Sequence, residues 1–395
     1  MPLVTLYGLG TILGAGIYVL IGEVAGKAGM FAPVSFFIAS IIAGFSAFSY
    51  AELSSRHPQS AGEAVYAQEA FSIRWISAAV GWSVVIIGVV SAATIANGFV
   101  GYFKIFIDTP DWVAIAILVI TLGIVAGWGI TESVTVASII TIIEILGLLS
   151  IIAVAGDSFA ELPGRLQEFT PPLDAQALVA VALGAFLAFY AFVGFEDIVN
   201  VAEEVKEPRR NLPIAIILAL GISTVLYLLV SLSAVLVLPL DILAGNDSPL
   251  AAIYEHKTKL SPKLISVVSI IAVVNGALIQ IIMGSRILYG MGKRAMAPRI
   301  FSTVNRFTRT PLIATASVTA LILTLALWLP LLKLAEISSF ITLAVFAFMN
   351  LSLWRLKRKN PCPTGVKTYP LAVPIVGFLL CGCFLVIQTV WGFIF

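Results

Sequence analysis

The first apolar segment, residues 4–27, contains the stretch Gly10-Thr11-Ile12-Leu13-Gly14-Ala15-Gly16-Ile17-Tyr18-Val19. Each of its three glycines lowers helix stability by about 1 kcal/mol relative to alanine. Backbone groups freed inside a membrane are costly unless a polar partner satisfies them. We therefore expect the helix to break here and its second half to begin near Ile17, with free N–H groups and the positive end of the helix dipole directed at the break. Such a helix start favours a carboxylate ligand.

The same glycines have a second interpretation, which is close packing of helices through small residues. Gly10 and Gly14 have the four-residue spacing of a small-xxx-small contact, and such contacts are common where membrane helices meet. From this segment alone, both interpretations remain open.

The composition assigns the class of protein. Of the 395 residues, 60% are hydrophobic and 11% are charged, and the mean hydropathy is +1.05. These values are far too apolar for a soluble globular protein. The apolar runs reach the roughly 20 residues that a membrane-spanning helix needs, without strand-like alternation. We predict an all-α polytopic membrane protein, and the net charge of +2 gives no support for a nucleic-acid partner.

Eleven apolar segments can be placed along the chain, and we predict that each is a transmembrane helix. They are residues 4–27, 33–54, 75–103, 112–129, 133–155, 176–203, 212–238, 264–291, 312–331, 333–354 and 371–395. The first lacks the basic start and small-residue cleavage site of a secretory signal peptide, so we expect it to remain as a span. Of the 23 Lys and Arg residues, 16 lie in or near the connections on one side and 7 on the other. Because basic connections face the cytoplasm, we expect a multi-pass protein of the cell membrane with a cytoplasmic N-terminus.

The sixth segment repeats the irregularity of the first. It carries Gly194 between Val193 and Phe195, followed directly by Glu196 and Asp197. A charge at mid-membrane costs from about 2.5 kcal/mol upward, and such residues usually line a cavity. We expect both carboxylates to face a polar interior, with Asp197 starting the second half of a broken helix. The alternative is a span that ends near Gly194, with both carboxylates among the lipid headgroups.

Interrupted segments at positions one and six predict an inverted repeat of five plus five helices. The repeats would cover about residues 1–156 and 175–355, with an extra helix at 371–395, all within one transporter domain of residues 1–395. In such a fold the binding site lies where the two breaks meet near the centre of the membrane.

Three stretches resemble the amino acid, polyamine and organocation (APC) transporter superfamily, close to its bacterial members that are similar to cationic amino acid transporters. The first is the glycine-rich stretch of residues 10–19. The second is Phe192-Val193-Gly194-Phe195-Glu196, followed by Ala202-Glu203-Glu204-Val205-Lys206-Glu207-Pro208-Arg209-Arg210-Asn211-Leu212-Pro213. The third is Gly284-Ser285-Arg286-Ile287-Leu288-Tyr289-Gly290-Met291. The resemblance covers nearly the whole chain.

The resemblance implies a leucine-transporter-like fold and a secondary active carrier that works by alternating access. The expected cargo is a small amino acid in symport with protons, and an amino acid or polyamine exchanger is the alternative. By analogy, Tyr190 is an aromatic gate and Glu196 is linked to proton movement. The substrate carboxylate would meet backbone N–H groups, and its ammonium group backbone carbonyls. The residues expected to bind substrate are Ile12, Leu13, Gly14, Ala15, Gly16, Tyr190, Ala191, Val193 and Gly194.

Segment five departs from the family pattern at Glu144, where several sodium-independent relatives carry a lysine. A glutamate cannot imitate a cation. It is able to titrate, or to complete a cation site with carbonyls of segment one and with Asn275 or Ser285. The alternative is a carboxyl group that simply hydrogen-bonds a neighbouring helix. We expect Glu144, Glu196 and Asn275 to couple transport to an ion, either a proton or sodium, and we expect no other cofactor.

Other functions have less support in the sequence. A non-transporting amino acid sensor usually carries a long soluble extension, and a channel would need a pore-lining ring or filter. The three cysteines have no metal-like spacing and both histidines lie in connections, so we expect neither a metal site nor an enzyme. Asn97 and Gln280 are candidates either for the cavity or for ties between helices. The Arg-rich connection after segment eight determines topology, with lipid binding left open. The sequence leaves the oligomeric state open.

Overall fold

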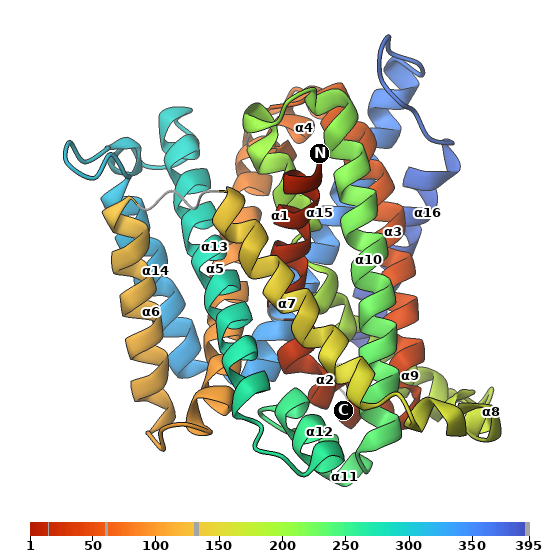
Figure 1. Cartoon of the computed structure of the whole chain (residues 1–395). Helices are drawn as coiled ribbons and strands as arrows, with labels where there is room; N and C mark the ends of the chain where they lie inside the picture. The colour runs from red at the N-terminus through yellow and green to blue at the C-terminus, as the bar shows by residue number, and fades with distance from the viewer. Residues whose placement is uncertain (15, 60–61, 130–133, 392–395) are drawn as a thin grey trace.

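The computed structural model describes residues 1–14, 16–59, 62–129 and 134–391, and it shows a bundle of long helices (Figure 1). The first half of the chain forms α1 (Pro2–Leu13), α2 (Gly16–Ala28), η1 (Gly29–Phe31), α3 (Ala32–Arg56), α4 (Gly62–Phe71), α5 (Arg74–Lys104), α6 (Asp111–Trp128), α7 (Val134–Val154), η2 (Ser158–Glu161), α8 (Leu162–Arg165), η3 (Leu166–Phe169), α9 (Ala175–Phe189), η4 (Tyr190–Phe192) and η5 (Phe195–Glu204). The second half forms α10 (Pro208–Val237), α11 (Leu240–Leu243), α12 (Pro249–Thr258), α13 (Lys263–Lys293), η6 (Arg299–Ser302), α14 (Leu312–Trp328), α15 (Leu331–Lys359) and α16 (Ala372–Trp391).

The prediction of an all-helical polytopic membrane protein is confirmed at this level. Among the described residues there is no strand, and nine helical stretches are long and apolar enough to cross a membrane. Each of the eleven predicted apolar segments overlaps at least one helix. Some helices extend beyond their apolar run: α10 begins at Pro208 and α15 continues to Lys359. Helical structure therefore extends about a turn beyond the hydrophobic pattern, at the start of α10 and at the end of α15.

Both irregular segments are interrupted in the structure. In the first, α1 ends at Leu13 and α2 begins at Gly16. In the second, α9 tightens into the short 3₁₀ turn η4, Val193 is extended, and Gly194 has a φ of 127° before η5 begins. Only glycine adopts this φ without strain, so the break in segment six is encoded at Gly194.

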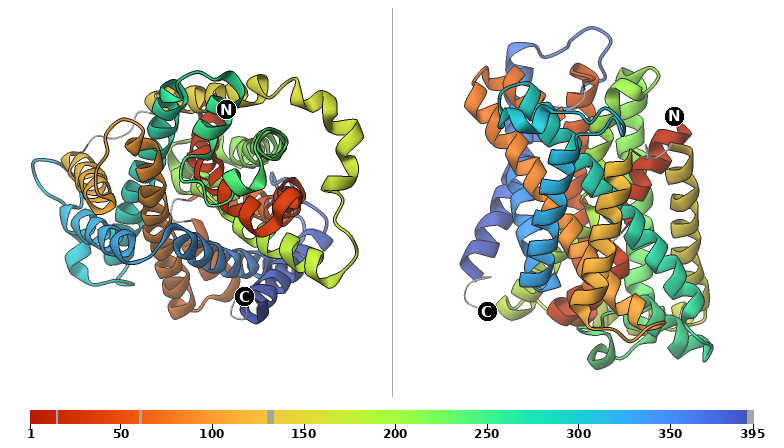
Figure 2. Two further views of the ribbon diagram at one scale, coloured as in Figure 1. Left: turned by 90° about the horizontal axis from the view of Figure 1, so that it is seen from below. Right: turned by 90° about the vertical axis from the view of Figure 1, so that its left-hand side faces the viewer.

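The two ends of the bundle differ in charge. The end that carries α4 and the connections 294–311 and 360–371 also holds the N-terminus, while α8, α11 and α12 lie at the opposite end (Figure 1). We call the first of these the basic end, because its connections carry Arg294, Arg306 and Lys367 among other cations. In the bundle, α5 packs along α13 and α3 along α10, and α1 contacts α7, α10 and α13. Two further views show α6 and α14 together on one flank and α16 on another (Figure 2).

A buried ion cluster joins three elements at the basic end. Glu52 of α3 is fully buried and accepts hydrogen bonds from Arg56 at 2.7 Å and from Lys357 of α15 at 2.7 Å. The backbone N–H of Tyr369 adds a third donor at 2.9 Å. Lys357 also donates to the carbonyl of Tyr369 at 2.6 Å. The cluster therefore fixes α15 and the connection to α16 against α3.

We expect Glu52→Gln to destabilise the fold by about 3 to 5 kcal/mol, because it leaves two buried cations without their carboxylate. Thermal unfolding of the purified protein in detergent measures the effect. The control is Lys333→Met, which removes the exposed pair between Lys333 and Glu336 and should cost less than about 1 kcal/mol. Equal losses of thermal stability in the two variants would show that the Glu52 cluster stabilises the fold no more than an exposed ion pair does.

Candidate functional site

A small enclosed cavity lies between the two interrupted segments. Its volume is about 20 Å³, which is room for about one water molecule. Elements from both halves of the chain enclose it: α1, α2, α5, η4 with the residue after it, and α13. The lining residues are Thr11, Ile12, Gly16, Ser91, Ile95, Tyr190, Val193, Gly276, Ile279 and Gln280. The two breaks therefore do meet around a polar space, and the site is closed in this structure.

The backbone groups freed at the breaks are satisfied partly by side chains of neighbouring elements. The Thr11 hydroxyl contacts the carbonyl oxygens of Gly8 at 2.9 Å and of Gly194 at 2.8 Å. The Tyr227 hydroxyl donates to the Ile12 carbonyl at 2.7 Å. Tyr190, the predicted gate, lines the cavity and donates its hydroxyl proton to the Ser91 carbonyl at 3.1 Å.

The predicted backbone donors differ in their availability. Helix α1 continues through Leu13, and the N–H of Gly14 donates to the Gly10 carbonyl at 3.1 Å as a helix cap. Neither Leu13 nor Gly14 lines the cavity, and Ala15 lies outside the described residues. Gly16 lines the cavity and begins α2, so the N–H groups of its first turn are the ones that a helix start leaves free. Of the predicted donors that the structure describes, Gly16 is the one that lines the cavity.

The glycines of segment one divide between the two interpretations. A Cβ at Gly10 would collide with Thr141 of α7, and one at Gly14 would crowd Gly276 of α13. These two glycines therefore provide close helix packing. A Cβ at Gly16 would collide with Ala191 beside the second break, so Gly16 brings the two interrupted segments together. Ala191 and Gly194 shape the site in this way without lining the cavity.

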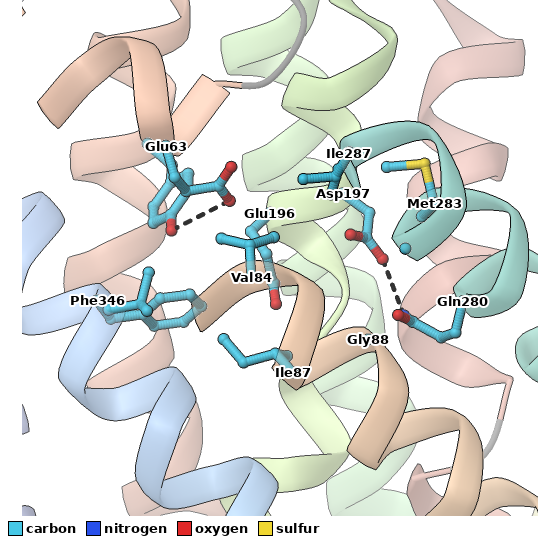
Figure 3. Close-up of a pocket in the computed structure, with 13 residues that line it drawn as sticks. Glu63, Val84, Ile87, Gly88, Glu196, Asp197, Gln280, Met283, Ile287 and Phe346 are labelled. Atoms are coloured by element: carbon cyan, nitrogen blue, oxygen red, sulfur yellow. Dashed lines mark hydrogen bonds between the residues drawn. The ribbon is translucent and has the colours of Figure 1, made fainter. Parts of the chain in front are cut away.

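Figure 3 shows the residues that line a second buried cavity, of about 10 Å³. Gln280 lines both cavities. Three carboxylates from two elements reach the second cavity: Glu63 from α4, and Glu196 and Asp197 from η5. All three are buried, and no ion pair among the described residues includes any of them.

The two carboxylates of η5 have different partners. Glu196 accepts a hydrogen bond from the backbone N–H of Gly194 at 2.8 Å, so it satisfies the start of η5. Asp197 accepts from the Gln280 side chain at 3.0 Å, which joins η5 to α13. Asp197 lies in the first turn of η5, as predicted, and the neighbouring Glu196 in the same turn reaches back over the break. The alternative that places both among headgroups is wrong, since both are buried in the bundle.

Glu63 is the functional candidate that sequence reasoning missed, because it lies in what looked like a polar turn between spans. The turn folds into α4, and the Tyr50 hydroxyl of α3 approaches the Glu63 carboxyl at 3.4 Å. Burial raises the pKa of Glu63 to about 8, with a further contribution from the charge of Asp197. Glu63 is therefore largely protonated at neutral pH. The signal in the sequence was an acidic residue in the first turn of a short apolar helix, Gly62–Phe71.

A larger vestibule of about 580 Å³ continues from the second cavity to the surface at the basic end. Glu63, Val84, Met283 and Ile287 line both spaces. Cations and carboxylates face the vestibule together, among them Arg286, Lys293, Arg294, Arg309, Glu203 and Glu204. The cavity at the breaks, the carboxylate cavity and the vestibule thus form a series that leads to one end of the bundle.

The predicted coupling residues Glu144 and Asn275 meet in the structure. Asn275 donates to the Glu144 carboxyl at 3.1 Å, and the Tyr18 hydroxyl donates to the Glu144 carbonyl at 2.6 Å. Ser285, the predicted alternative to Asn275, donates its hydroxyl proton to the Ile281 carbonyl one turn earlier on α13. Asn97 ties α5 to α14 through the Ala326 carbonyl at 3.1 Å. Within the described ranges, no group of three or more His, Cys, Asp and Glu residues is arranged to hold a metal ion.

Comparison with known proteins identifies the family. A family model described as amino acid permease matches residues 3–394. The chain belongs to the amino acid permease family. This confirms the resemblance to the APC superfamily. The relatives reported below are named as transporters or permeases and not as enzymes.

Individual relatives differ in their named cargo. The permease is 30% identical to "Cationic amino acid transporter 2, vacuolar" from Arabidopsis thaliana over 91% of this chain, and it spans 60% of that relative's length. It is 28% identical to "Branched-chain amino acid permease BcaP" from Bacillus subtilis over 98% of this chain and 87% of BcaP. The "Methylthioribose transporter" of Bacillus subtilis is also 28% identical, over 96% of this chain and 85% of that protein. The family therefore supports amino acid transport without fixing the substrate.

We expect Gly194→Ala to reduce substrate binding by the permease and to lower its thermal stability. A methyl group at this position would collide with the Thr11 carbonyl and would strain the positive φ. Thermal-shift measurements with and without amino acids test both effects. The control is Gly221→Ala in α10, where the added methyl group meets open space and should stabilise the helix by up to about 1 kcal/mol. A Gly194→Ala permease that behaves like this control would contradict the assigned role.

We expect the thermal stability of the permease to fall as the pH rises from about 4.5 to about 8, because Glu63 is buried as the neutral acid. The pKa of Glu63 is higher in the folded state than in the unfolded state. This difference favours folding most below the unfolded-state pKa, and the stabilisation is lost as the pH rises through the folded-state pKa. Melting curves across this range should be flatter for Glu63→Gln than for the wild type. Glu69→Gln changes an exposed carboxyl of the same helix and should keep the wild-type slope. An unchanged slope in Glu63→Gln would rule out a neutral, buried Glu63.

Proposed function

We propose that this permease is a secondary active transporter that moves small amino acids across the cell membrane by alternating access, in symport with protons. The observation that carries the proposal is the closed cavity between the two interrupted segments. The breaks offer backbone N–H and carbonyl groups, and the side chains that line this cavity are all uncharged. Such a site suits a zwitterion, because half-helix ends supply both N–H donors and carbonyl acceptors.

The substrate sites follow from this placement. The carboxylate of the amino acid binds the free N–H groups around Gly16 at the start of α2, and its ammonium group binds carbonyls at Ile12, Tyr190 and Val193. Leu13 ends α1 and Gly14 caps it, and Ala191 and Gly194 position the second break; Ala15 stays a predicted substrate-binding residue. The cavity has room for only about one water molecule, so substrate binding requires the surrounding helices to move apart.

The series of spaces gives the direction of release. The vestibule opens at the basic end, and the basic connections of a membrane protein face the cytoplasm. In this proposal the permease is inward-facing, with the vestibule open to the cytoplasm and the substrate cavity closed. With eleven spans, the N-terminus lies in the cytoplasm, and the two repeats of five helices, about residues 1–156 and 175–355, form one domain with the extra helix.

Proton coupling has two candidate positions. Glu196 lies on η5 directly behind the second break, and Glu144 contacts Asn275 on the other side of α1. A proton on either carboxyl would change hydrogen bonds that hold an interrupted segment. Sodium is the alternative coupling ion, and exchange of one amino acid for another is the alternative mode of transport.

A cationic amino acid or polyamine is a second candidate substrate. Glu63, Glu196 and Asp197 lie together without an ion pair, and Gln280 separates them from the cavity at the breaks. A long cationic side chain that displaced Gln280 would gain these carboxylates as partners. A small amino acid does not need these carboxylates, because in this proposal backbone carbonyls bind its ammonium group.

Uptake into proteoliposomes tests the function. Purified permease would be screened with radiolabelled natural amino acids and polyamines, with and without a pH gradient, sodium, and internal amino acid. We expect uptake of small neutral amino acids that depends on an inwardly directed proton gradient. Flux that requires internal amino acid would replace symport with exchange. Binding without flux under every condition would overturn the carrier and favour a sensor.

We expect Glu144→Gln to abolish or greatly weaken the dependence of uptake on the pH gradient, while exchange across the membrane continues. The amide keeps the shape of the side chain and its contact with Asn275 but cannot exchange a proton. Glu161→Gln, in a connection at the opposite end, provides the control. If Glu144→Gln retained the wild-type dependence on pH and cations, Glu144 would have only a structural role, and the same experiment on Glu196→Gln would decide the remaining candidate.

A further inference from the structure

An apolar groove runs along the outer surface of the bundle between α6 and α14. Its volume is about 580 Å³. The right-hand view of Figure 2 faces the flank on which α6 and α14 lie. Small residues line the groove on both helices, Gly123 and Gly127 on α6 and Ala316 and Ala320 on α14. The larger residues that border it are Ile120, Ile124, Trp128, Thr308, Leu312, Thr315, Thr319 and Leu323. None of these lining residues is charged.

The length of the groove matches one leaflet of a bilayer. On α14 it extends from Leu312 to Leu323, which is about 16 Å at 1.5 Å per residue. The hydrocarbon core of a bilayer is about 30 Å thick, so the groove covers about half of it. It begins at the basic end, where Trp128 is 74% exposed, and exposed tryptophans are typical of the membrane interface.

The connection at the mouth of the groove is basic and partly apolar. Between residues 294 and 311 there are four arginines, Arg294, Arg299, Arg306 and Arg309, and there is no acidic residue. Phe307 is 96% exposed, and Ile300 and Val304 are also exposed. Alternation of arginines with exposed apolar residues is typical of a segment that lies in the headgroup region. Arg306 lies two residues before Thr308 in the sequence, and Thr308 lines the groove.

We propose that this groove binds one anionic phospholipid of the leaflet at the basic end, with an acyl chain along α6 and α14 and the phosphate at Arg306. The occupant is a phospholipid because the groove is one leaflet long, uncharged inside and cationic only at the interface. An anionic headgroup is preferred because basic residues at a membrane surface attract it by about 1 kcal/mol each. The site lies outside the transport cavities, and it does not depend on the proposed substrate.

Native mass spectrometry of the purified permease tests the site. The protein would be titrated with phosphatidylglycerol and with phosphatidylcholine that has the same acyl chains. We expect one retained phosphatidylglycerol, bound more tightly than phosphatidylcholine. Arg306→Gln should weaken phosphatidylglycerol by about fivefold, the factor typical of one basic residue at an anionic surface, and should weaken phosphatidylcholine less, because its choline cation neutralises the phosphate. Arg210→Gln, an exposed arginine at the start of α10, should leave both affinities unchanged.

A second pair of variants tests the acyl-chain groove. Ala320→Phe fills the groove and should weaken both lipids, whereas Leu321→Phe enlarges an exposed neighbour outside it and should weaken neither. The proposal is overturned if both lipids bind the wild type equally, or if Arg306→Gln and Arg210→Gln have the same effect. A wild-type dimer that Ala320→Phe converts to a monomer would also overturn it, because the groove would then be a protein contact.

Discussion

A peptide group inside a bilayer has no water to bind, and this constraint governs the centre of the permease. Both interrupted segments expose backbone groups at membrane depth, where each unsatisfied group is costly. Side chains from other elements satisfy part of them: Thr11 bonds the Gly194 carbonyl, Tyr227 the Ile12 carbonyl, and Glu196 the Gly194 N–H. The start of α2 at Gly16 receives none of these three bonds. In the proposed function, a zwitterionic ligand pairs with the backbone N–H and carbonyl groups that remain unsatisfied. The groups that make the breaks costly then also select the ligand.

The glycines around the first break act in two different ways. Gly10 and Gly14 fix α1 closely against Thr141 and Gly276, which holds the first half of the segment against α7 and α13. Gly16 instead fits against Ala191 beside the second break. One short stretch of sequence therefore carries both a packing contact with α7 and α13 and a contact with the second break. In the proposed alternating-access mechanism, the first contact persists while the second opens.

Much of the fold could be predicted from the sequence, because the apolar periodicity and the membrane thickness leave few choices for a helix. The break at Gly194 was predictable for the same reason, since a glycine and two carboxylates interrupt an apolar run. The position of Glu63 was not predictable in this way. Its burial depends on α4 folding back against α3, and that contact is set by tertiary packing rather than by local hydropathy. The availability of the Gly14 N–H was equally hidden, because one further helical bond to Gly10 consumes it.

Buried carboxylates at the basic end fall into two groups with opposite physical consequences. Glu52 is held by two cations and a backbone N–H, so its charge is compensated and its neighbours are fixed in place. Glu63, Glu196 and Asp197 share a cavity and have no cationic partner among the described side chains. Like charges in one desolvated space repel one another. The Glu52 cluster therefore holds its neighbours in place, whereas the second group has no such cationic link among the described side chains and lies between the cavity at the breaks and the vestibule.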